Sequence, residues 1–172
     1  MAGSPHLVML LRHAIAEEQS SSGRDDDRRL TGEGKRKLRE VVAGMRALDL
    51  PVDLVLSSPL RRAVETAEIV IDAYEAKPQM QITPALTPGA GPDAVIAALA
   101  DVGRPSGTVL VGHEPDLAAL ASTLLVGTPG LLHMGFRKAG LAGIMVAALP
   151  PRAAGALEFF MTPQQLRRIG RA

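Results

Sequence analysis

Apolar and polar positions alternate in blocks along the chain, and these blocks predict a mixed α/β domain. Short apolar runs have the length of buried strands, and between them apolar residues recur at helical spacing. The expected strands span 7–11, 52–56 and 108–111, and the expected helices span 31–48, 60–74, 93–102 and 116–125. Strands that alternate with helices form a largely parallel sheet with helices on both faces. We therefore predict a three-layer α/β/α sandwich.

The second half of the chain adds shorter elements to this sandwich. A short strand is expected near 80–83, and two late strands are expected at 143–149 and 157–161. The late pair is joined by few residues, which is typical of an antiparallel edge, and a basic helix follows Thr162-Pro163. We find no internal repeat and no boundary, so residues 1–172 are expected to form one domain.

Two segments are expected to be flexible. Residues 17–29 are polar and charged, with a serine-rich stretch followed by three aspartates, and they predict an exposed loop. Residues 1–6, which include His6, are expected to be frayed.

Composition narrows the possible partners. Hydrophobic residues make up 47% and charged residues 22% of the chain, as in globular proteins. A formal net charge of +1 gives no general attraction to nucleic acid or membranes, and 2% aromatic residues leave few platforms for base stacking. The chain has no cysteine, which excludes disulfides and cysteine-bound metals and is compatible with the cytoplasm, where we expect the protein. We find no targeting segment, and the longest apolar stretch, 141–149, is much shorter than a membrane span.

Three of the predicted buried strands end in polar residues. The first is followed by Arg12-His13, the second by residues 58–62 (S-P-L-R-R), and the third by residues 112–114 (G-H-E). A parallel sheet brings the carboxyl ends of its strands to one edge, so two histidines and up to three arginines should meet there. Two histidines without a third ligand make a poor zinc site, and arginines would repel a cation. The same arginines favour a phosphate. The pattern predicts a metal-free phosphoryl-transfer site, with one histidine as nucleophile and the other stabilising charge.

At these residues the sequence resembles a known family. The segments R-H-A, S-S-P-L-R-R-A-V-E-T-A and V-G-H-E-P resemble the three signatures of the histidine phosphatase (phosphoglycerate mutase-like) superfamily. The resemblance continues through L-T-G-E-G at 30–34, A-L-T-P at 85–88 and M-T-P at 161–163. In so short a chain, this set is most similar to the SixA-type phosphohistidine phosphatases. It implies a phosphoglycerate mutase-like fold and an enzyme without cofactor or metal.

The resemblance also implies roles for individual residues. His13 matches the nucleophile that becomes phosphorylated, and Arg12 matches the phosphate-binding arginine beside it. The arginine of the second signature falls on Arg62, while Arg61 occupies a variable position and is expected to be solvated. His113 matches the second histidine, which contacts the phosphoryl group.

The two histidines should differ in their protonation. His13 must be neutral to attack, and the neighbouring arginines should disfavour its protonation. We expect a backbone carbonyl to fix its tautomer, and we expect His113 to be protonated when phosphate is bound.

The general acid is the gap in this pattern. In the family a carboxylate often protonates the leaving oxygen, and it often comes from the segment that corresponds to 79–92, which here contains no Asp or Glu. An alkoxide needs such an acid, whereas an imidazole leaves readily once its nitrogen is protonated. This favours a phosphohistidine substrate over a sugar phosphate. Glu114 is an alternative acid, with a helix-start carboxylate as its other interpretation, and Asp93 is a more distant candidate.

The resulting hypothesis is a phosphatase that removes phosphate from a histidine of a phosphotransfer-type protein in signal transduction, through a phosphohistidine intermediate on His13. Short linkers between the signatures leave little material for a lid, which suits a substrate presented by another protein. The alternatives are a small-molecule phosphomonoesterase that uses Glu114 as its acid, a mutase, and a non-catalytic phosphate-binding protein.

Overall fold

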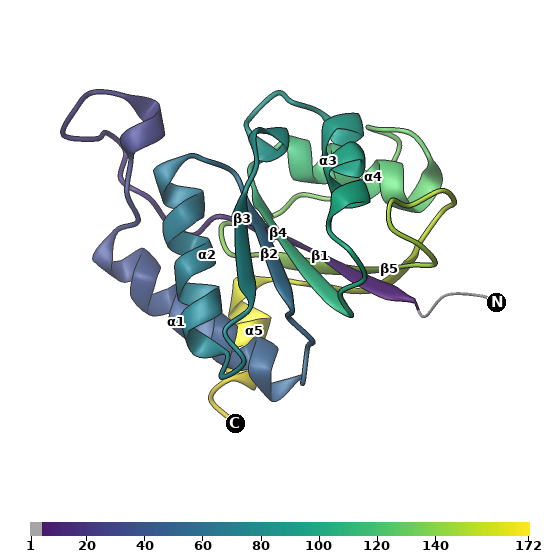
Figure 1. The fold of residues 1–172 in the computed structure, drawn as a ribbon. Helices are drawn as coiled ribbons and strands as arrows, with labels where there is room; N and C mark the ends of the chain where they lie inside the picture. The colour runs from purple at the N-terminus through teal and green to yellow at the C-terminus, as the bar shows by residue number, and fades with distance from the viewer. Residues whose placement is uncertain (1–4) are drawn as a thin grey trace.

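A six-stranded sheet forms the centre of the structure, a computed structural model that describes residues 5–172 (Figure 1). Its strands are β1 (His6–Arg12), β2 (Leu54–Ser57), β3 (Gln79–Ile82), β4 (Gly107–Gly112), β5 (Leu141–Val146) and β6 (Ala156–Met161). Their order in the sheet is β3-β2-β4-β1-β5-β6. Strands β3, β2, β4 and β1 are parallel to one another, β5 is antiparallel to β1, and β6 is antiparallel to β5. The predicted architecture is confirmed.

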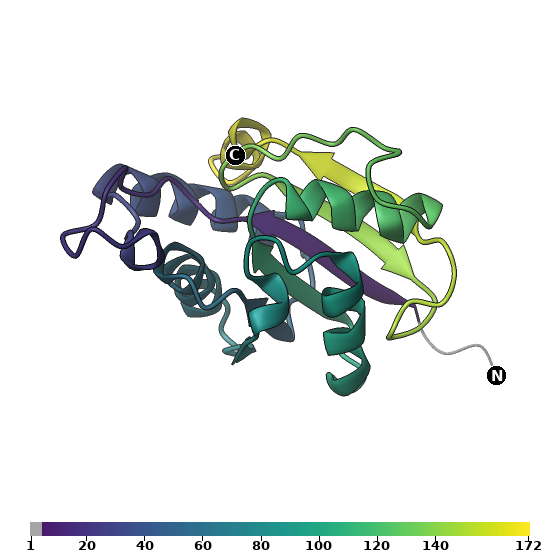
Figure 2. The same ribbon diagram turned by 90° about the horizontal axis from the view of Figure 1, so that it is seen from above.

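Helices cover both faces of this sheet (Figures 1 and 2). They are α1 (Gly32–Ala47), α2 (Arg61–Ala73), α3 (Pro92–Ala98), α4 (Asp116–Val126) and α5 (Pro163–Ile169). Strand β1 is buried on both sides: Leu7, Met9 and Leu11 join the core that α1, α2 and α5 cover. Val8 and Leu10 join the core under α3 and α4. Burial on both faces explains why β1 is apolar at consecutive positions.

The beginning of α1 anchors the chain just after β1. The Thr31 hydroxyl caps the helix by accepting a hydrogen bond from the Gly34 N–H at 2.9 Å, and the Thr31 N–H donates to the Ile15 carbonyl. A Cβ at Gly34 would lie 2.1 Å from that same carbonyl oxygen, so a residue with a side chain would force the helix away from Ile15. The L-T-G-E-G segment therefore holds α1 against the segment that follows β1.

Several element boundaries differ from the sequence-based expectation. The helix expected at 93–102 is a seven-residue α3 followed by a 3₁₀ helix, Leu99–Asp101, and β5 covers 141–146 instead of 143–149. His6 is not frayed: it begins β1, it is buried, and its Nδ1 lies 2.8 Å from the Pro105 carbonyl oxygen. The prediction was wrong there because a histidine does not extend the apolar pattern of the strand. The carbonyl that binds its ring lies 99 residues away along the chain, so the local sequence does not indicate it. Residues 1–4 lie outside the described residues.

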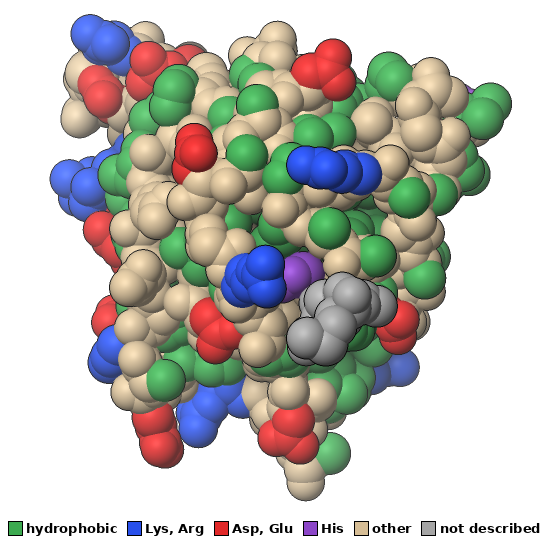
Figure 3. Space-filling model, turned by 45° about the vertical axis from the view of Figure 1, so that its right-hand side comes forward, with side chains coloured by type: hydrophobic (Ala, Val, Ile, Leu, Met, Phe, Trp, Pro, Cys, Tyr) green, Lys and Arg blue, Asp and Glu red, His purple; other side chains and the backbone are tan. Residues whose placement is uncertain are grey.

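The surface carries mixed charges. On the face drawn in Figure 3, basic and acidic side chains are interspersed among other residues, in line with the formal net charge of +1. Across residues 5–172, each helix is too short or too polar to cross a bilayer.

Candidate functional site

Three neighbouring strands, β2, β4 and β1, end at the same level of the sheet. The register pairs Arg12 with Gly112, and Ser57 with Val111. The ladder extends one residue further on each side of β4: the His13 N–H donates to the Gly112 carbonyl, and the Ser58 N–H donates to the Val111 carbonyl. The residues that follow the three strands are therefore brought together, as the motif order predicts.

This edge holds the two predicted histidines in contact. The ring centroids of His13 and His113 lie 5.1 Å apart, with an angle of 52° between the ring planes. Both side chains are buried, and so is Arg62 in the first turn of α2. The positive charges of Arg62 and Arg12 act on both rings. The structure thus brings Arg12, His13, Arg62 and His113 into one cluster.

His13 is held as a neutral imidazole with a defined tautomer. Its Nδ1 lies 2.8 Å from the Ala14 carbonyl oxygen. Because a carbonyl oxygen accepts hydrogen bonds, Nδ1 must carry the hydrogen, and the lone pair lies on Nε2. Burial, together with the nearby His113 and the two arginines and against the opposing effect of the Ala14 hydrogen bond, lowers the pKa of His13 to about 3.

His113 presents a hydrogen-bond donor in the same place. Its Nε2 lies 2.8 Å from the Ser58 Oγ, which also accepts a hydrogen bond from the Leu60 N–H. The Ser58 hydroxyl hydrogen is best satisfied by donation to Nε2, which puts the proton of neutral His113 on Nδ1. Burial, followed by the charge of Arg62, lowers the pKa of His113 to about 4.

Arg12 is held by a chain of contacts that involves Glu114. The Arg12 Nη1 donates to the Phe136 carbonyl at 2.7 Å, and the Phe136 N–H donates to the Glu114 Oε1 at 2.7 Å. The Ala118 N–H in α4 donates to the other Glu114 oxygen at 3.0 Å. Both carboxylate oxygens of Glu114 therefore bind backbone N–H groups, as a helix-start carboxylate does, and one of them holds Phe136, the residue whose carbonyl binds Arg12.

Arg62 is held by a residue that sequence reasoning missed. Its Nη1 donates to the Asp25 carbonyl at 2.9 Å, and its Nη2 donates to the Asp25 Oδ2 at 3.0 Å. Asp25 belongs to the short 3₁₀ helix Asp25–Asp27 within the exposed loop 17–29. The run of three aspartates was the sequence signal for it, but the run did not indicate a partner 37 residues away.

Three buried nitrogens of the cluster have no hydrogen-bond partner within the described residues: Arg12 Nε, Arg62 Nε and His113 Nδ1. An unpaired buried donor destabilises a fold by about 1–3 kcal/mol, so three in one cluster call for an explanation. Donors on two cations and an imidazole suit an oxyanion with several acceptor atoms. In the described part of the chain, no three histidine, aspartate or glutamate side chains gather as a metal would need.

The depressed histidine pKa values predict how stability depends on pH. Between the ordinary pKa of histidine and the lowered values, the unfolded chain binds more protons than the folded chain, so the free energy of unfolding decreases as pH decreases. From pH 7 to pH 5, each of the two rings should contribute a loss of about 2 kcal/mol. Urea denaturation at both pH values should show that the free energy of unfolding decreases less between pH 7 and pH 5 for His113→Gln than for the unmodified protein. Equal losses in the two proteins would contradict this account.

Comparisons with known proteins agree with this arrangement. The family model for the histidine phosphatase superfamily (branch 1) matches residues 8–87. An uncharacterized protein of Picosynechococcus sp. is 34% identical over 156 residues, which cover 90% of this chain and 93% of the relative.

Solved structures show the same fold. The protein histidine phosphatase SixA complexed with tungstate has a TM-score of 0.79 and 26% identity, covering 93% of this chain and 99% of that chain. A mycobacterial glucosyl-3-phosphoglycerate phosphatase in complex with VO3 has a TM-score of 0.67, covering 91% of this chain and 99% of that one; at 17% identity this likeness concerns the fold alone. The two structural matches cover more than nine-tenths of this chain, and the family model covers the ends of β1 and β2. The chain therefore belongs to the histidine phosphatase superfamily.

Proposed function

We propose that this phosphatase removes phosphate from a phosphohistidine of another protein, with His13 as the nucleophile. The observation that carries the proposal is the state of His13: a neutral ring with its lone pair on Nε2, next to three unpaired donors. The lone pair can attack phosphorus while the donors bind the phosphoryl oxygens. Arg12, Arg62 and His113 are the phosphate-binding residues in this proposal.

The reaction then has two steps. In the first, the His13 Nε2–P bond forms and the P–N bond of the substrate breaks; the substrate ring, protonated on its other nitrogen, leaves as a neutral imidazole and keeps the electron pair of the broken bond. In the second, water attacks phosphorus, the P–Nε2 bond breaks, and inorganic phosphate leaves. The Ala14 carbonyl keeps the Nδ1 hydrogen in place throughout, so that the second displacement returns His13 to its starting tautomer.

The choice of a phosphohistidine rests on the leaving group. Segment 79–92, which forms β3, the 3₁₀ helix Pro84–Leu86 and the start of α3, contains no carboxylate to protonate an alkoxide. The similarity to a protein histidine phosphatase supports the same choice. On this proposal the partner is a phosphotransfer-type protein in a signalling pathway, and the protein works in the cytoplasm.

A second candidate is a small-molecule phosphomonoesterase in which Glu114 is the acid. The position of Glu114 directly after His113 favours it, and a phosphatase of the same fold is named for glucosyl-3-phosphoglycerate. Against it, both Glu114 oxygens accept backbone N–H groups. Each oxygen would have to give up its hydrogen bond to a backbone N–H in order to carry the proton that a general acid donates.

A substrate panel separates the two candidates. We expect kcat/KM for a phosphohistidine protein to exceed that for sugar phosphates and nucleotides by at least about 10²-fold, since the missing acid affects only the esters. Glu114→Gln should lower the rates on both substrate classes by a similar factor, because it disturbs Phe136, the residue whose carbonyl binds Arg12. Faster hydrolysis of an ester, together with a loss in Glu114→Gln confined to esters, would favour the second candidate.

A further inference from the structure

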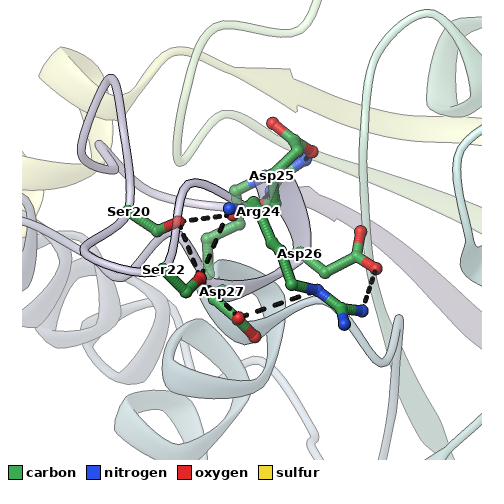
Figure 4. Close-up of polar contacts among 7 residues, drawn as sticks. Ser20, Ser22, Arg24, Asp25, Asp26 and Asp27 are labelled. Carbon is green, nitrogen blue, oxygen red and sulfur yellow. Dashed lines mark hydrogen bonds and ion pairs between the residues drawn. The ribbon is translucent and has the colours of Figure 1, made fainter.

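The loop 17–29 reaches the site through one residue. Asp25 contacts Arg62 with both its backbone carbonyl and its carboxylate, whereas its neighbours face elsewhere. Asp26 and Asp27 pair with Arg24, and Asp27 also accepts a hydrogen bond from Ser22 (Figure 4). Figure 4 shows Asp25 pointing away from this local network. Of the three carboxylates in this 3₁₀ helix, two therefore contact the loop itself and one contacts the site.

The contact with Asp25 uses only one of the two edges of the Arg62 guanidinium. A guanidinium can bind a two-oxygen partner along its terminal edge, Nη1 and Nη2, or along its side edge, Nε and Nη2. Asp25 occupies the terminal edge. Nε, on the side edge, is buried and has no hydrogen-bond partner within residues 5–172. One edge is thus used by the protein, and the other remains for a ligand oxygen.

Asp25 is itself fixed on its other side. Its Oδ1 lies 2.9 Å from the Arg28 Nε, while its Oδ2 accepts from Arg62. Desolvation opposes ionisation of this carboxyl, but the hydrogen bond and charge of Arg62, followed by the charge of Arg28, hold its pKa below the ordinary value. The carboxylate is therefore ionised at neutral pH and bridges two arginines. Arg62 is only 5% exposed, so a fixed counter-ion also lowers the cost of burying its charge.

We propose that Asp25 is a positioning residue for Arg62: it holds the terminal edge of the guanidinium so that the side edge faces the phosphoryl group. This deepens the proposed function and rests on it for the role of Arg62. The opposite arrangement, in which Asp25 stands in for the phosphate and must be displaced, predicts the reverse effect on anion binding. A variant that removes the Asp25 charge therefore distinguishes the positioning role from the competing role.

The test compares Asp25→Asn with Asp26→Asn. The control lies in the same 3₁₀ helix, removes the same charge, and contacts only Arg24 of the loop in the described structure. Isothermal titration with tungstate measures anion binding without turnover. We expect Asp25→Asn to weaken tungstate binding about tenfold, because a misdirected guanidinium loses the paired geometry, and Asp26→Asn to change it less than twofold. Asp25→Glu should recover part of the loss, because it restores the charge.

The outcomes distinguish this proposal from its alternatives. Unchanged or tighter tungstate binding by Asp25→Asn would overturn it, because removing a competing carboxylate strengthens anion binding. Equal losses in Asp25→Asn and Asp26→Asn would also overturn it, since they would reflect loop charge alone. Asp25→Asn should melt at a lower temperature than the unmodified protein, because buried Arg62 loses its charged partner, and titration well below that melting temperature separates positioning from unfolding. If the enzyme fails to hydrolyse phosphohistidine while Asp25→Asn still weakens tungstate binding, the substrate assignment fails and the positioning role stands.

Discussion

Replacing His13 by alanine should abolish turnover, with a loss of at least about 10⁴-fold in kcat on a phosphohistidine protein. No other described side chain combines a neutral imidazole, a lone pair fixed on Nε2 and three unpaired donors beside it. The variant keeps Arg12, Arg62 and His113, so it should still bind tungstate. Binding without turnover would separate the nucleophile from the phosphate-binding residues.

The second measurement on this variant is the covalent intermediate. A substrate carrying radioactive phosphate should label the unmodified enzyme, and the label should be lost in acid and stable in alkali, as a phosphoramidate is. His13→Ala should not be labelled. The matched control is His133→Ala, because His133 is an exposed histidine outside the cluster. Full labelling of His13→Ala would remove His13 from the mechanism. An unmodified enzyme that binds tungstate but is neither labelled nor active would be a phosphate-binding protein.

The positions of three cluster residues could be predicted from the ends of buried strands, because Arg12 ends β1, His13 follows it and His113 follows β4, whereas Arg62 lies in the first turn of α2 and was found through its sequence signature. Strand β1 is apolar without interruption from Leu7 to Leu11 since both of its faces are covered, and the polar pair after it marks the sheet edge. The same reasoning applies to His113 after β4. Local sequence patterns are sufficient where a residue's place depends on the strand it follows.

The contacts that hold these residues could not be predicted in the same way. Asp25 meets Arg62 across 37 positions, and Phe136 meets Arg12 across 124. Both partners lie in irregular segments, where no periodicity indicates the direction of a side chain. Glu114 illustrates the same limit, since its sequence position suits an acid while its contacts are those of a backbone anchor.

The neighbouring residues Arg61 and Arg62 provide a strict test of how the site recognises phosphate. The Arg61 side chain is 42% exposed and pairs with Glu65 one helical turn away, whereas Arg62 is 5% exposed and faces the histidines and Asp25. We expect Arg62→Lys to lower kcat/KM about 10²- to 10³-fold, although the charge is conserved. A lysine ammonium has no side edge, so it cannot bind Asp25 and a phosphoryl oxygen in the paired geometry of a guanidinium.

Arg61→Lys is the matched control, because it makes the same substitution at the adjacent position of α2. It should change kcat/KM less than twofold, since Arg61 pairs with Glu65 and lysine keeps a positive charge within reach of that buried carboxylate. Both variants should melt near the unmodified protein, which would attribute the difference to the site. If Arg62→Lys were as active as Arg61→Lys, charge alone would be sufficient for phosphate binding. The paired edges of Arg62, and with them the positioning role of Asp25, would then have no part in catalysis.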